Sequence, residues 1–225
     1  MNDFVNGSSA FSEHVASLLA RLEYRRAATQ DAREAIYRLR YDANLRERAI
    51  DPNVDERLMD RFDAVSNVAN FGIFIDGELT SALRLHVLSA ARPYSPALDA
   101  YSDLLRDTVE AGRTIIDGNR FVADYPRARA FPHLPYVTLR LGIMAADYYG
   151  AELITASVRA EHVPFYKREY RATKMCEPRP YPTLVKPLSL IVIDYETNGA
   201  EICARHPFYR STVQERADLF AGVLD

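Results

Sequence analysis

The stretch of sequence that decides the fold is IIDGNRFVAD, residues 115–124. Its apolar ends, Ile115 with Ile116 and Phe121 with Val122, predict a strand that is buried on at least one face. Between these ends stand an acid, a glycine, an amide and an arginine. Polar side chains inside a buried strand need hydrogen-bond partners or a chemical function. The run therefore predicts both the middle of a sheet and a candidate site.

The alternation of side chains along this strand leads to a geometric prediction. In a regular strand, Asp117 and Asn119 would share one face, while Gly118 and Arg120 would take the other. A β-bulge at Gly118 would change this alternation and bring Asp117 and Arg120 to the same cleft. It would also leave backbone N–H groups without ladder partners, free to bind a ligand. We therefore predict a bulge at Gly118.

The flanking segments alternate between helical and strand periodicity. Helices are expected at residues 11–23, 31–49, 99–112, 134–149 and 161–170, with a further helix within 200–225. Strands are expected at residues 24–29, 71–76, 77–89, 115–124, 151–158 and 188–196. Asp76-Gly77 favours a tight hairpin between two of these strands, and Gly150 ends the long fourth helix. This order predicts a mixed α/β (α+β) fold with one central sheet flanked by helices.

Composition limits the classes of function. The chain has 225 residues, 48% of them hydrophobic, and is expected to form one domain over residues 1–225. A net charge of −3 and a pI near 6.0 argue against nucleic-acid binding through a basic field. The sequence shows neither a secretion signal nor an apolar run of membrane-spanning length, so a soluble protein without stable membrane insertion is expected. The two cysteines and five histidines lack the spacing of a metal site or a disulfide framework, which favours a metal-free protein in a reducing cytoplasm.

Residues 142–170 resemble the thioester-binding half of the GNAT acyltransferase superfamily. They read GIMAADYYGAELITASVRAEHVPFYKREY, a helix, a strand and a short helix. The short helix of that superfamily commonly carries a Phe-Tyr pair and then a glycine before an aromatic residue. Phe165, Tyr166 and Tyr170 match this pattern, whereas Glu169 stands where glycine is usual. The resemblance implies a three-layer fold whose central sheet is splayed to bind an acyl thioester.

Residues 33–122 show a narrower resemblance, to the N-acyl amino acid synthases and the related acyl-homoserine-lactone (autoinducer) synthases. Five fragments occur in the order typical of these families. They are Arg40-Tyr41, Asp60-Arg61-Phe62-Asp63, Gly77 with Arg84-Leu85, Arg92-Pro93-Tyr94, and Asp117-Gly118-Asn119-Arg120-Phe121. The sequence departs from the pattern where Asn44 replaces an aromatic residue, Asp117 a glutamate and Gly118-Asn119 a Leu-Ser pair. These departures favour the amino-acid-acylating branch, or an uncharacterised relative of it, over the lactone-making branch.

Acyl transfer from a thioester to an amine requires a neutral amine, a polarised carbonyl group and a proton for the departing thiolate. A carboxylate can bind the incoming ammonium and accept its proton, and Asp117 is the first candidate, ahead of Asp60 and Asp63. Backbone donors freed at Gly118 would polarise the carbonyl group. The superfamily pattern implies that Tyr166 protonates the thiolate. The expected catalytic residues are therefore Asp117, Arg120 and Tyr166.

The other motif residues are expected to bind substrate. They are Arg40, Asp60, Asp63, Arg84, Gly118, Asn119, Phe121 and Val122. A structural alternative stays open for the charged members, because three arginines and two aspartates would also form a buried network that holds the N-terminal helices against the sheet. Tyr166 has a similar alternative as an aromatic filler between helix and sheet.

The segment before the long helix bears on the identity of the acyl donor. Coenzyme A-dependent members of the superfamily place a glycine-rich loop there, whose backbone amides bind the pyrophosphate. Residues 124–142 contain no such glycine pair. This favours the phosphopantetheine thioester of acyl carrier protein over acyl-CoA as the co-substrate, with no permanently bound cofactor. Arg127, Arg129 and Arg168 are expected to dock the acidic carrier protein, the alternative being ordinary solvated charges.

These features together predict an N-acyltransferase that moves a medium or long acyl group to the amine of an amino acid or related small molecule. Two functions from other classes remain open. One is an acyl-CoA-dependent N-acetyltransferase of a small amine. The other is a non-catalytic regulator that keeps the fold and binds an acyl thioester.

Overall fold

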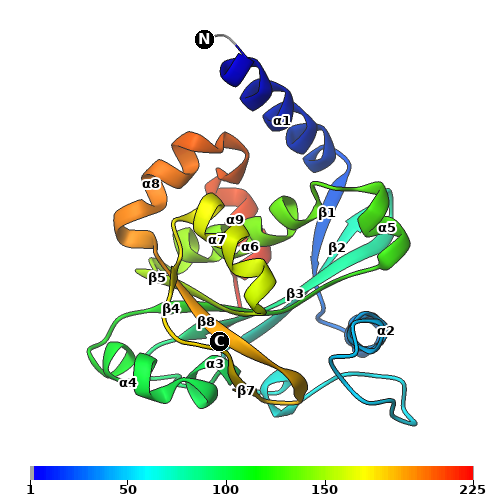
Figure 1. Ribbon diagram of the computed structural model, residues 1–225, viewed down its shortest axis with the longest axis vertical. Coiled ribbons are helices and arrows are strands. Elements are labelled where there is room, and N and C mark those ends of the chain that lie inside the picture. The colour runs from blue at the N-terminus through cyan, green and yellow to red at the C-terminus, as the bar shows by residue number, and fades with distance from the viewer. Residues whose placement is uncertain (1–2, 225) are drawn as a thin grey trace.

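The core of the protein is an open, mostly antiparallel sheet of eight strands (Figure 1). The computed structural model describes residues 3–224, with side chains from residue 10 onward. The sheet order is β1-β2-β3-β4-β5-β8-β6, and β7 also pairs with β8. The strands are β1 (Leu22–Arg26), β2 (Val68–Ile75), β3 (Glu78–Leu88), β4 (Ile115–Ala123), β5 (Leu153–Val158), β6 (Thr173–Lys174), β7 (Arg179–Tyr181) and β8 (Leu184–Asp194). The β4–β5 pair is parallel, and the other strand pairs are antiparallel.

Helices cover both faces of the sheet, which confirms the predicted three-layer α/β class. The α-helices are α1 (Asp3–Leu19), α2 (Gln30–Arg46), α3 (Pro96–Ala100), α4 (Ser102–Glu110), α5 (Tyr125–Ala130), α6 (Leu134–Tyr149), α7 (Val163–Tyr170), α8 (Tyr195–Arg205) and α9 (Val213–Phe220), and short 3-10 turns η1 (Arg61–Asp63), η2 (Ala160–His162) and η3 (Pro207–Tyr209) connect them. Figure 1 shows α6, α7, α8 and α9 on one side of the sheet and α2, α3 and α4 on the other. Within the described residues, no helix is both long and apolar enough to cross a membrane.

The hydrophobic core lies mainly between α6 and the sheet. Val137 and Leu141 of α6 are fully buried against Phe71, Leu83 and Ile116 of the strands. Burying a side chain of this kind stabilises a fold by about 1.5–3 kcal/mol. A separate apolar cluster joins α3 and α4 to the opposite face of the sheet. Helices therefore pack against both faces of the sheet, and the polar residues of β4 lie in the interior of the protein.

The β2–β3 hairpin follows the prediction from Asp76-Gly77. Both residues have positive φ, 52° at Asp76 and 82° at Gly77. This is the backbone of the tight turn that connects twisted antiparallel strands. Gly150 also has positive φ, 62°, and ends α6 as expected. These two turns fix the order of the strands on either side of β4.

Several boundaries differ from the predicted ones for physical reasons. The first helix ends at Leu19, and Leu22, which the predicted helix 11–23 included, begins β1. The expected helix 99–112 is split into α3 and α4 at Tyr101, whose hydroxyl donates to the Leu188 carbonyl at 2.8 Å. The expected C-terminal helix is two helices, α8 and α9, joined by η3. Phe220 of α9 packs against Phe71, so this C-terminal region completes the core.

The bulge in β4 lies two residues beyond the predicted position. The ladder with β3 runs through Gly118, which pairs with Leu85, and through Asn119, which pairs with Arg84. The register then shifts, and Arg120 has a φ of 53°. The prediction of a bulge at Gly118 was therefore wrong. The bulge turns Asn119 and Arg120, two consecutive residues, toward the same face of the sheet.

Candidate active site

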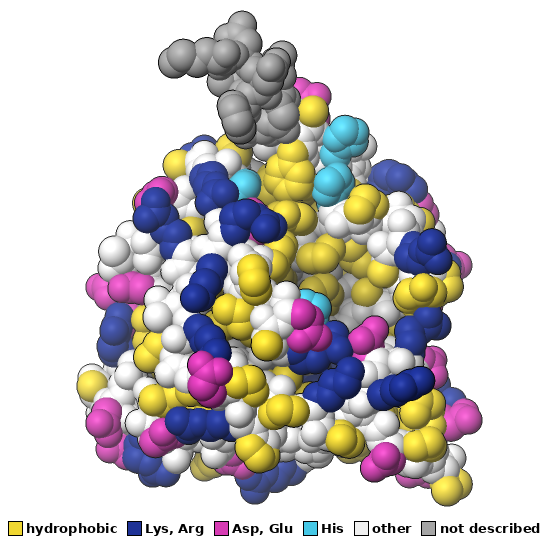
Figure 2. All heavy atoms as spheres, in the orientation of Figure 1, with side chains coloured by type: hydrophobic (Ala, Val, Ile, Leu, Met, Phe, Trp, Pro, Cys, Tyr) yellow, Lys and Arg dark blue, Asp and Glu magenta, His cyan; other side chains and the backbone are white. Residues whose placement is uncertain are grey.

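A cavity of about 590 Å³ opens beside the second half of β4. This volume falls within the range of small-molecule sites. It is lined by strands β3, β4, β5, β7 and β8 and by helices α2, α5, α6 and α7. In Figure 2 a hollow lined by hydrophobic side chains is flanked by Lys and Arg side chains on both sides.

The cavity exists because β4 and β5 diverge. Their parallel pairing ends where Gly118 meets Ala156. Beyond this point β4 continues along β3 as far as Ala123, while β5 continues along β8 as far as Val158. The two strands form a V, and residues 118–123 of β4 and 154–158 of β5 line the cavity. Backbone N–H and C=O groups on the inner edges of such a V are available to a ligand.

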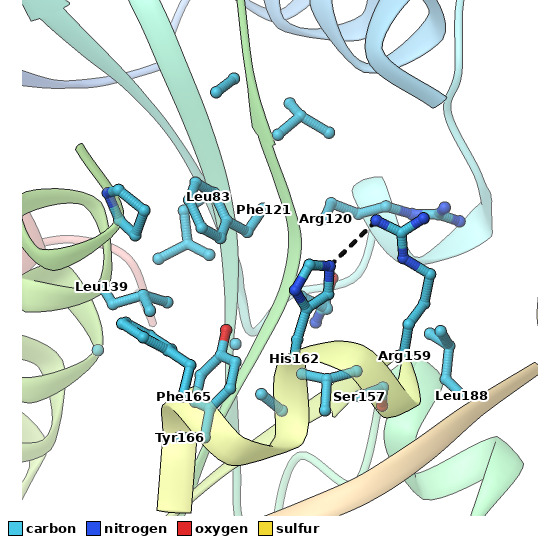
Figure 3. A pocket seen from close by; sticks show the side chains of 18 of the residues that line it. Leu83, Arg120, Phe121, Leu139, Ser157, Arg159, His162, Phe165, Tyr166 and Leu188 are labelled. Atoms are coloured by element: carbon cyan, nitrogen blue, oxygen red, sulfur yellow. Dashed lines mark hydrogen bonds between the residues drawn. The ribbon is translucent and has the colours of Figure 1, made fainter. Parts of the chain in front are cut away.

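The cavity has an apolar side and a polar side (Figure 3). Leu83, Phe121, Leu139 and Phe165 line the apolar side, and Arg120, Ser157, Arg159 and His162 line the polar side. Such a division suits an elongated ligand with a hydrocarbon part and a polar end. Of the predicted substrate-binding residues, Gly118, Asn119, Phe121 and Val122 line this cavity.

Tyr166 reaches the cavity from α7. Its side chain is 8% exposed, and Figure 3 shows its hydroxyl oxygen pointing into the cavity. Burial raises the pKa of Tyr166 well above its ordinary value. The phenol therefore stays protonated at neutral pH and can donate a hydrogen bond or a proton to a bound group. Tyr166 also packs against Phe165, with the ring centres 5.3 Å apart, so its role as proton donor stays a prediction beside the alternative of an aromatic filler.

Five of the predicted charged residues form one buried network that joins β3 and β4 to α2 and η1. Arg40 Nη1 donates to Asp63 Oδ1 at 2.8 Å, and Arg84 lies 2.8 Å from Asp63 Oδ2. Arg84 also donates to both oxygens of Asp60, at 2.7 and 3.0 Å, and Arg120 Nη2 donates to Asp60 Oδ2 at 2.6 Å. These arginines outweigh the effect of burial and hold the pKa of both aspartates below the usual range.

Of this network, Arg120 is the member that lines the cavity. Arg40 and Arg84 are completely buried, and the side chains of Asp60 and Asp63 are at most 4% exposed. The structure therefore supports the alternative in which the network holds η1 and α2 against the sheet. The network reaches the cavity through two residues that line it. One is Arg120, and the other is Asn119, whose Oδ1 accepts a hydrogen bond from Arg84 at 2.6 Å.

Asn119 connects this network to Asp117. Its Nδ2 donates to Asp117 Oδ2 at 3.1 Å and lies 3.1 Å from His86 Nδ1. His86 Nε2 lies 3.0 Å from the Phe62 carbonyl, which can only accept, so Nε2 carries the proton and Nδ1 accepts from Asn119. Burial, with the charge of Arg84, lowers the pKa of His86 to about 3 and keeps it neutral.

Asp117 is completely buried and does not line the cavity. Thr155 donates to its Oδ1 at 3.2 Å from β5. Burial raises the pKa of Asp117 to about 6, against opposing hydrogen bonds from Ser95 and Thr155. Its role as the base stays a prediction, with the added condition that the proton reaches it through an intervening group.

The raised pKa of Asp117 gives a prediction about stability. The folded state holds this proton more tightly than the unfolded state, so the stabilisation is present below about pH 4 and is lost as the pH rises through 6. Asparagine carries no charge at any pH. We expect the loss of unfolding free energy in Asp117→Asn to be roughly 1–2 kcal/mol smaller at pH 8 than at pH 5.

Urea denaturation at the two pH values measures this difference. The control is Asp55→Asn, which removes an exposed carboxyl group. A penalty for Asp117→Asn that is constant or grows with pH would contradict the assignment of a raised pKa to Asp117.

The arginines predicted to dock a carrier protein lie on α5 and α7, which both border the cavity. Arg127 pairs with Glu78 at 3.0 Å, and Arg129 stacks on Tyr125 with its guanidinium 5.9 Å from the ring centre. Arg168 pairs with Glu169 at 2.6 Å. All three guanidinium groups remain at the protein surface, and their role in docking stays a prediction.

The sequence interpretation missed several polar residues of the cavity, Arg159 and His162 of its polar side among them. Ser157 comes from β5, Tyr181 from β7, and Lys186 from β8. The strand that carries Tyr181 has three residues and includes Pro180, so it gave no periodic signal. A group of three or more His, Cys, Asp or Glu side chains able to hold a metal ion is absent from the described residues.

Comparison with known proteins gives a match to one family model and matches to solved structures. A model of the N-acyl amino acid synthase FeeM family matches residues 35–194. FeeM, an N-acyl amino acid synthase from uncultured soil microbes, superposes with a TM-score of 0.65 and 16% identity, over 79% of this chain and 92% of that chain. The AHL synthase LasI superposes with a TM-score of 0.56 and 16% identity, over 76% and 88% of the two chains.

A third structural neighbour is an acyl-CoA N-acyltransferase from Pseudomonas aeruginosa, with a TM-score of 0.52 and 18% identity over 76% of this chain and 97% of that chain. Curated protein sequences give no significant match. At these identities the structural neighbours establish the GNAT-like fold. The family model covers more than half of the chain, from α2 to the end of β8. The chain therefore belongs to the N-acyl amino acid synthase FeeM family, and it is an N-acyltransferase enzyme.

Proposed function

We propose that the enzyme transfers a medium or long acyl group from the phosphopantetheine thioester of acyl carrier protein to the amine of an amino acid or related small molecule. The observation that carries this proposal is the cavity in the V between β4 and β5, which has one apolar and one polar side. The apolar side suits a hydrocarbon chain, and the polar side suits the acceptor. The thioester carbon would lie near Gly118, where the strands part.

The proposed reaction is direct transfer. The amine nitrogen attacks the thioester carbon, the C–N bond forms, the C–S bond breaks, and the sulfur leaves as a thiol. Backbone N–H groups on the inner edge of β4 would stabilise the negative charge that develops on the carbonyl oxygen. Tyr166, whose raised pKa keeps it protonated, would supply the proton to the sulfur.

Asp117 completes the proposed proton balance. With a pKa of about 6 it is largely ionised at pH 7 and can accept the proton of the attacking amine. Because it does not line the cavity, this transfer would pass through water. The reaction would take place in a reducing cytoplasm, which suits a chain whose Cys176 and Cys203 are both free thiols.

Acyl-CoA is the second candidate donor. One structural neighbour is described as a CoA-dependent acyl-homoserine lactone synthase and was solved with isopentyl-CoA. The segment before α6 in this chain has no glycine pair to bind a pyrophosphate, and α5 occupies part of it. This supports the carrier-protein donor, as do Arg127 and Arg129 beside the cavity.

Donor choice is tested by assaying dodecanoyl-carrier protein and dodecanoyl-CoA with the wild type and with Arg127→Glu/Arg129→Glu. Reversing surface charges that meet an acidic partner weakens association, so we expect the KM for the carrier substrate to rise about tenfold while the KM for the CoA substrate stays constant. Arg106→Glu, an exposed arginine on α4, is the control. An unchanged KM for the carrier substrate would exclude docking at α5.

A further inference from the structure

His162 brings an imidazole ring to the rim of the cavity. It is the last residue of η2 and the N-cap of α7, and it is exposed, so a ligand can reach it. Tyr166 lies four residues further on, which places both side chains on the same face at the start of α7, and both line the cavity. In Figure 3 the His162 ring lies between Tyr166 and Arg159.

Arg159 determines which ring nitrogen of His162 carries the proton. Its Nη2 lies 3.0 Å from His162 Nε2, and a guanidinium group can only donate, so Nε2 accepts this hydrogen bond. A neutral imidazole has one N–H group, which must therefore be at Nδ1. Nδ1 does not cap the helix and makes no hydrogen bond to any residue that the structure describes. Figure 3 shows it on the side of the ring that faces away from Arg159.

Arg159 is itself held in place by two carboxylates. Its Nη1 donates to Glu47 Oε2 at 3.0 Å, and its Nε lies 3.1 Å from Glu161 Oε1. Glu47 follows the last residue of α2, so this pair connects α2 to η2 beside the cavity. Partial burial and the positive charge of Arg159 lower the pKa of His162 below its ordinary value. The imidazole is therefore neutral at pH 7, with its orientation fixed by Arg159.

The chemistry of this ring is restricted to donation. Nδ1 already carries a proton and Nε2 is occupied by Arg159, so the ring does not fit the role of a base for the attacking amine. A neutral N–H group that is fixed in advance is suited to an oxygen on which negative charge develops, because it stabilises that charge without reorganising during the reaction. In acyl transfer this oxygen is the carbonyl oxygen of the thioester.

We propose that His162 is a catalytic hydrogen-bond donor whose Nδ1–H binds the carbonyl oxygen of the acyl thioester, and that Arg159 is the positioning residue that holds His162 in this tautomer. This inference rests on the proposed function and adds a side-chain donor to the backbone donors of β4. As the amine attacks, the carbonyl oxygen gains negative charge and the hydrogen bond strengthens. When the C–S bond breaks, the carbonyl group forms again, and His162 keeps its proton throughout.

NMR spectroscopy measures the tautomer directly. Long-range proton–nitrogen correlation spectra of the nitrogen-15-labelled protein distinguish the two neutral forms of histidine, and His162→Asn identifies the signals of His162. We expect the Nδ1–H form in the wild type at pH 7.5. Arg159→Met should shift His162 toward the Nε2–H form, because the donor that occupies Nε2 is lost. A wild-type His162 that carries its proton on Nε2, or on both nitrogens, would overturn the inference.

Substitution by the two amides separates the ring nitrogens. The side-chain N–H₂ group of asparagine can lie near the position of Nδ1, whereas that of glutamine reaches the position of Nε2. We expect His162→Ala and His162→Gln to lower kcat about 30-fold or more, with the KM for the acyl donor within about threefold of the wild type. His162→Asn should recover about fivefold or more of this loss. Equal kcat values in His162→Asn and His162→Ala would contradict donation from Nδ1.

His14 supplies the matched control for these variants. It is an exposed histidine on α1 that does not line the cavity, so His14→Asn should keep the kcat of the wild type. A fall in kcat as large as that of His162→Ala would show that the loss does not depend on the cavity, and would overturn the role of His162.

Binding of unreactive analogues of the acyl donor tests the same contact without turnover. S-(2-oxotridecyl)phosphopantetheine has a carbonyl group near the place of the thioester carbonyl, and S-tridecylphosphopantetheine has none. Isothermal titration calorimetry should show that the wild type binds the ketone about fivefold or more tightly than the thioether, and that His162→Ala retains less than about half of this preference.

An equal affinity for the two analogues in the wild type, a full preference in His162→Ala, or binding of neither analogue would overturn the contact. A preference that depends on His162, in an enzyme that forms no N-acyl amino acid, would instead contradict the proposed function alone.

Discussion

Asp63→Asn should lower the free energy of unfolding by about 3–5 kcal/mol, the cost of breaking a buried ion pair from one side. Asp63 Oδ1 accepts from Arg40 at 2.8 Å, and Asp63 Oδ2 accepts from the Asp60 backbone N–H at 3.0 Å and lies 2.8 Å from Arg84. Without its charge, three buried guanidinium groups would share Asp60 alone. Because Asp63 does not line the cavity, the loss should appear in stability before it appears in substrate affinity.

The matched control for this variant is Asp99→Asn. Asp99 pairs with Arg61 at the surface, where the two side chains are 44% and 72% exposed. Exposed pairs contribute little, so this change should cost less than about 1 kcal/mol. Adding Arg40→Met to Asp63→Asn should recover part of the loss, because it removes a stranded charge. Urea denaturation that gives equal costs for Asp63→Asn and Asp99→Asn would contradict a structural role for the network.

The pH dependence of this effect has a definite sign. Arg40 and Arg84, acting against burial, hold the pKa of Asp63 below its usual range. A carboxylate with a depressed pKa stabilises the folded state above its unfolded pKa, and this stabilisation is lost as the pH falls through the folded value. The difference between the wild type and Asp63→Asn should therefore be largest near neutral pH and should shrink below about pH 4.

Gly118→Val should lower turnover about 100-fold while changing the unfolding free energy by less than about 1.5 kcal/mol. Gly118 lines the cavity where β4 and β5 part. A Cβ there would lie 3.6 Å from the Thr155 carbonyl oxygen and 3.8 Å from Leu85, which are ordinary contacts. The backbone tolerates a side chain, and valine suits a strand. Its methyl groups would occupy the proposed thioester position.

Two smaller substitutions distinguish the effect of filling the thioester position from the effect of filling another part of the cavity. Gly118→Ala should have a weaker effect than Gly118→Val at the same place. Gly142→Ala adds a methyl group from α6, 3.9 Å from Ile154, and should leave turnover within about threefold of the wild type. Steady-state kinetics with one acyl donor measure all three variants. Near-normal turnover in Gly118→Val would show that the thioester does not bind at this position.

Local signals in the sequence were sufficient for the elements around β4. The Asp76-Gly77 turn and the Gly150 helix end depend on backbone geometry that few residues adopt, so they could be predicted directly. The apolar ends of the 115–124 run also located a central strand correctly. The same reasoning placed the bulge at Gly118, because glycine is the residue that bends a strand most easily.

The position of the bulge depends on tertiary contacts that the sequence does not display. Arg120 adopts a φ of 53°, which costs a non-glycine residue about 1–2 kcal/mol. Its ion pair with Asp60 and its hydrogen bond to Thr183 offset this cost, and both partners are distant along the chain. Tyr181 was missed for a related reason, since its strand has three residues and its place in the cavity is set by β8.

The most direct test of the proposed function is mass spectrometry of a reaction containing the purified enzyme, dodecanoyl-carrier protein and a mixture of free amino acids. The proposal predicts an N-dodecanoyl amino acid, released with an equal amount of free thiol on the carrier. It also predicts that product formation is lost together with turnover in Gly118→Val. Thiol release without an N-acylated product, or transfer of acetyl groups alone from acetyl-CoA, would contradict it.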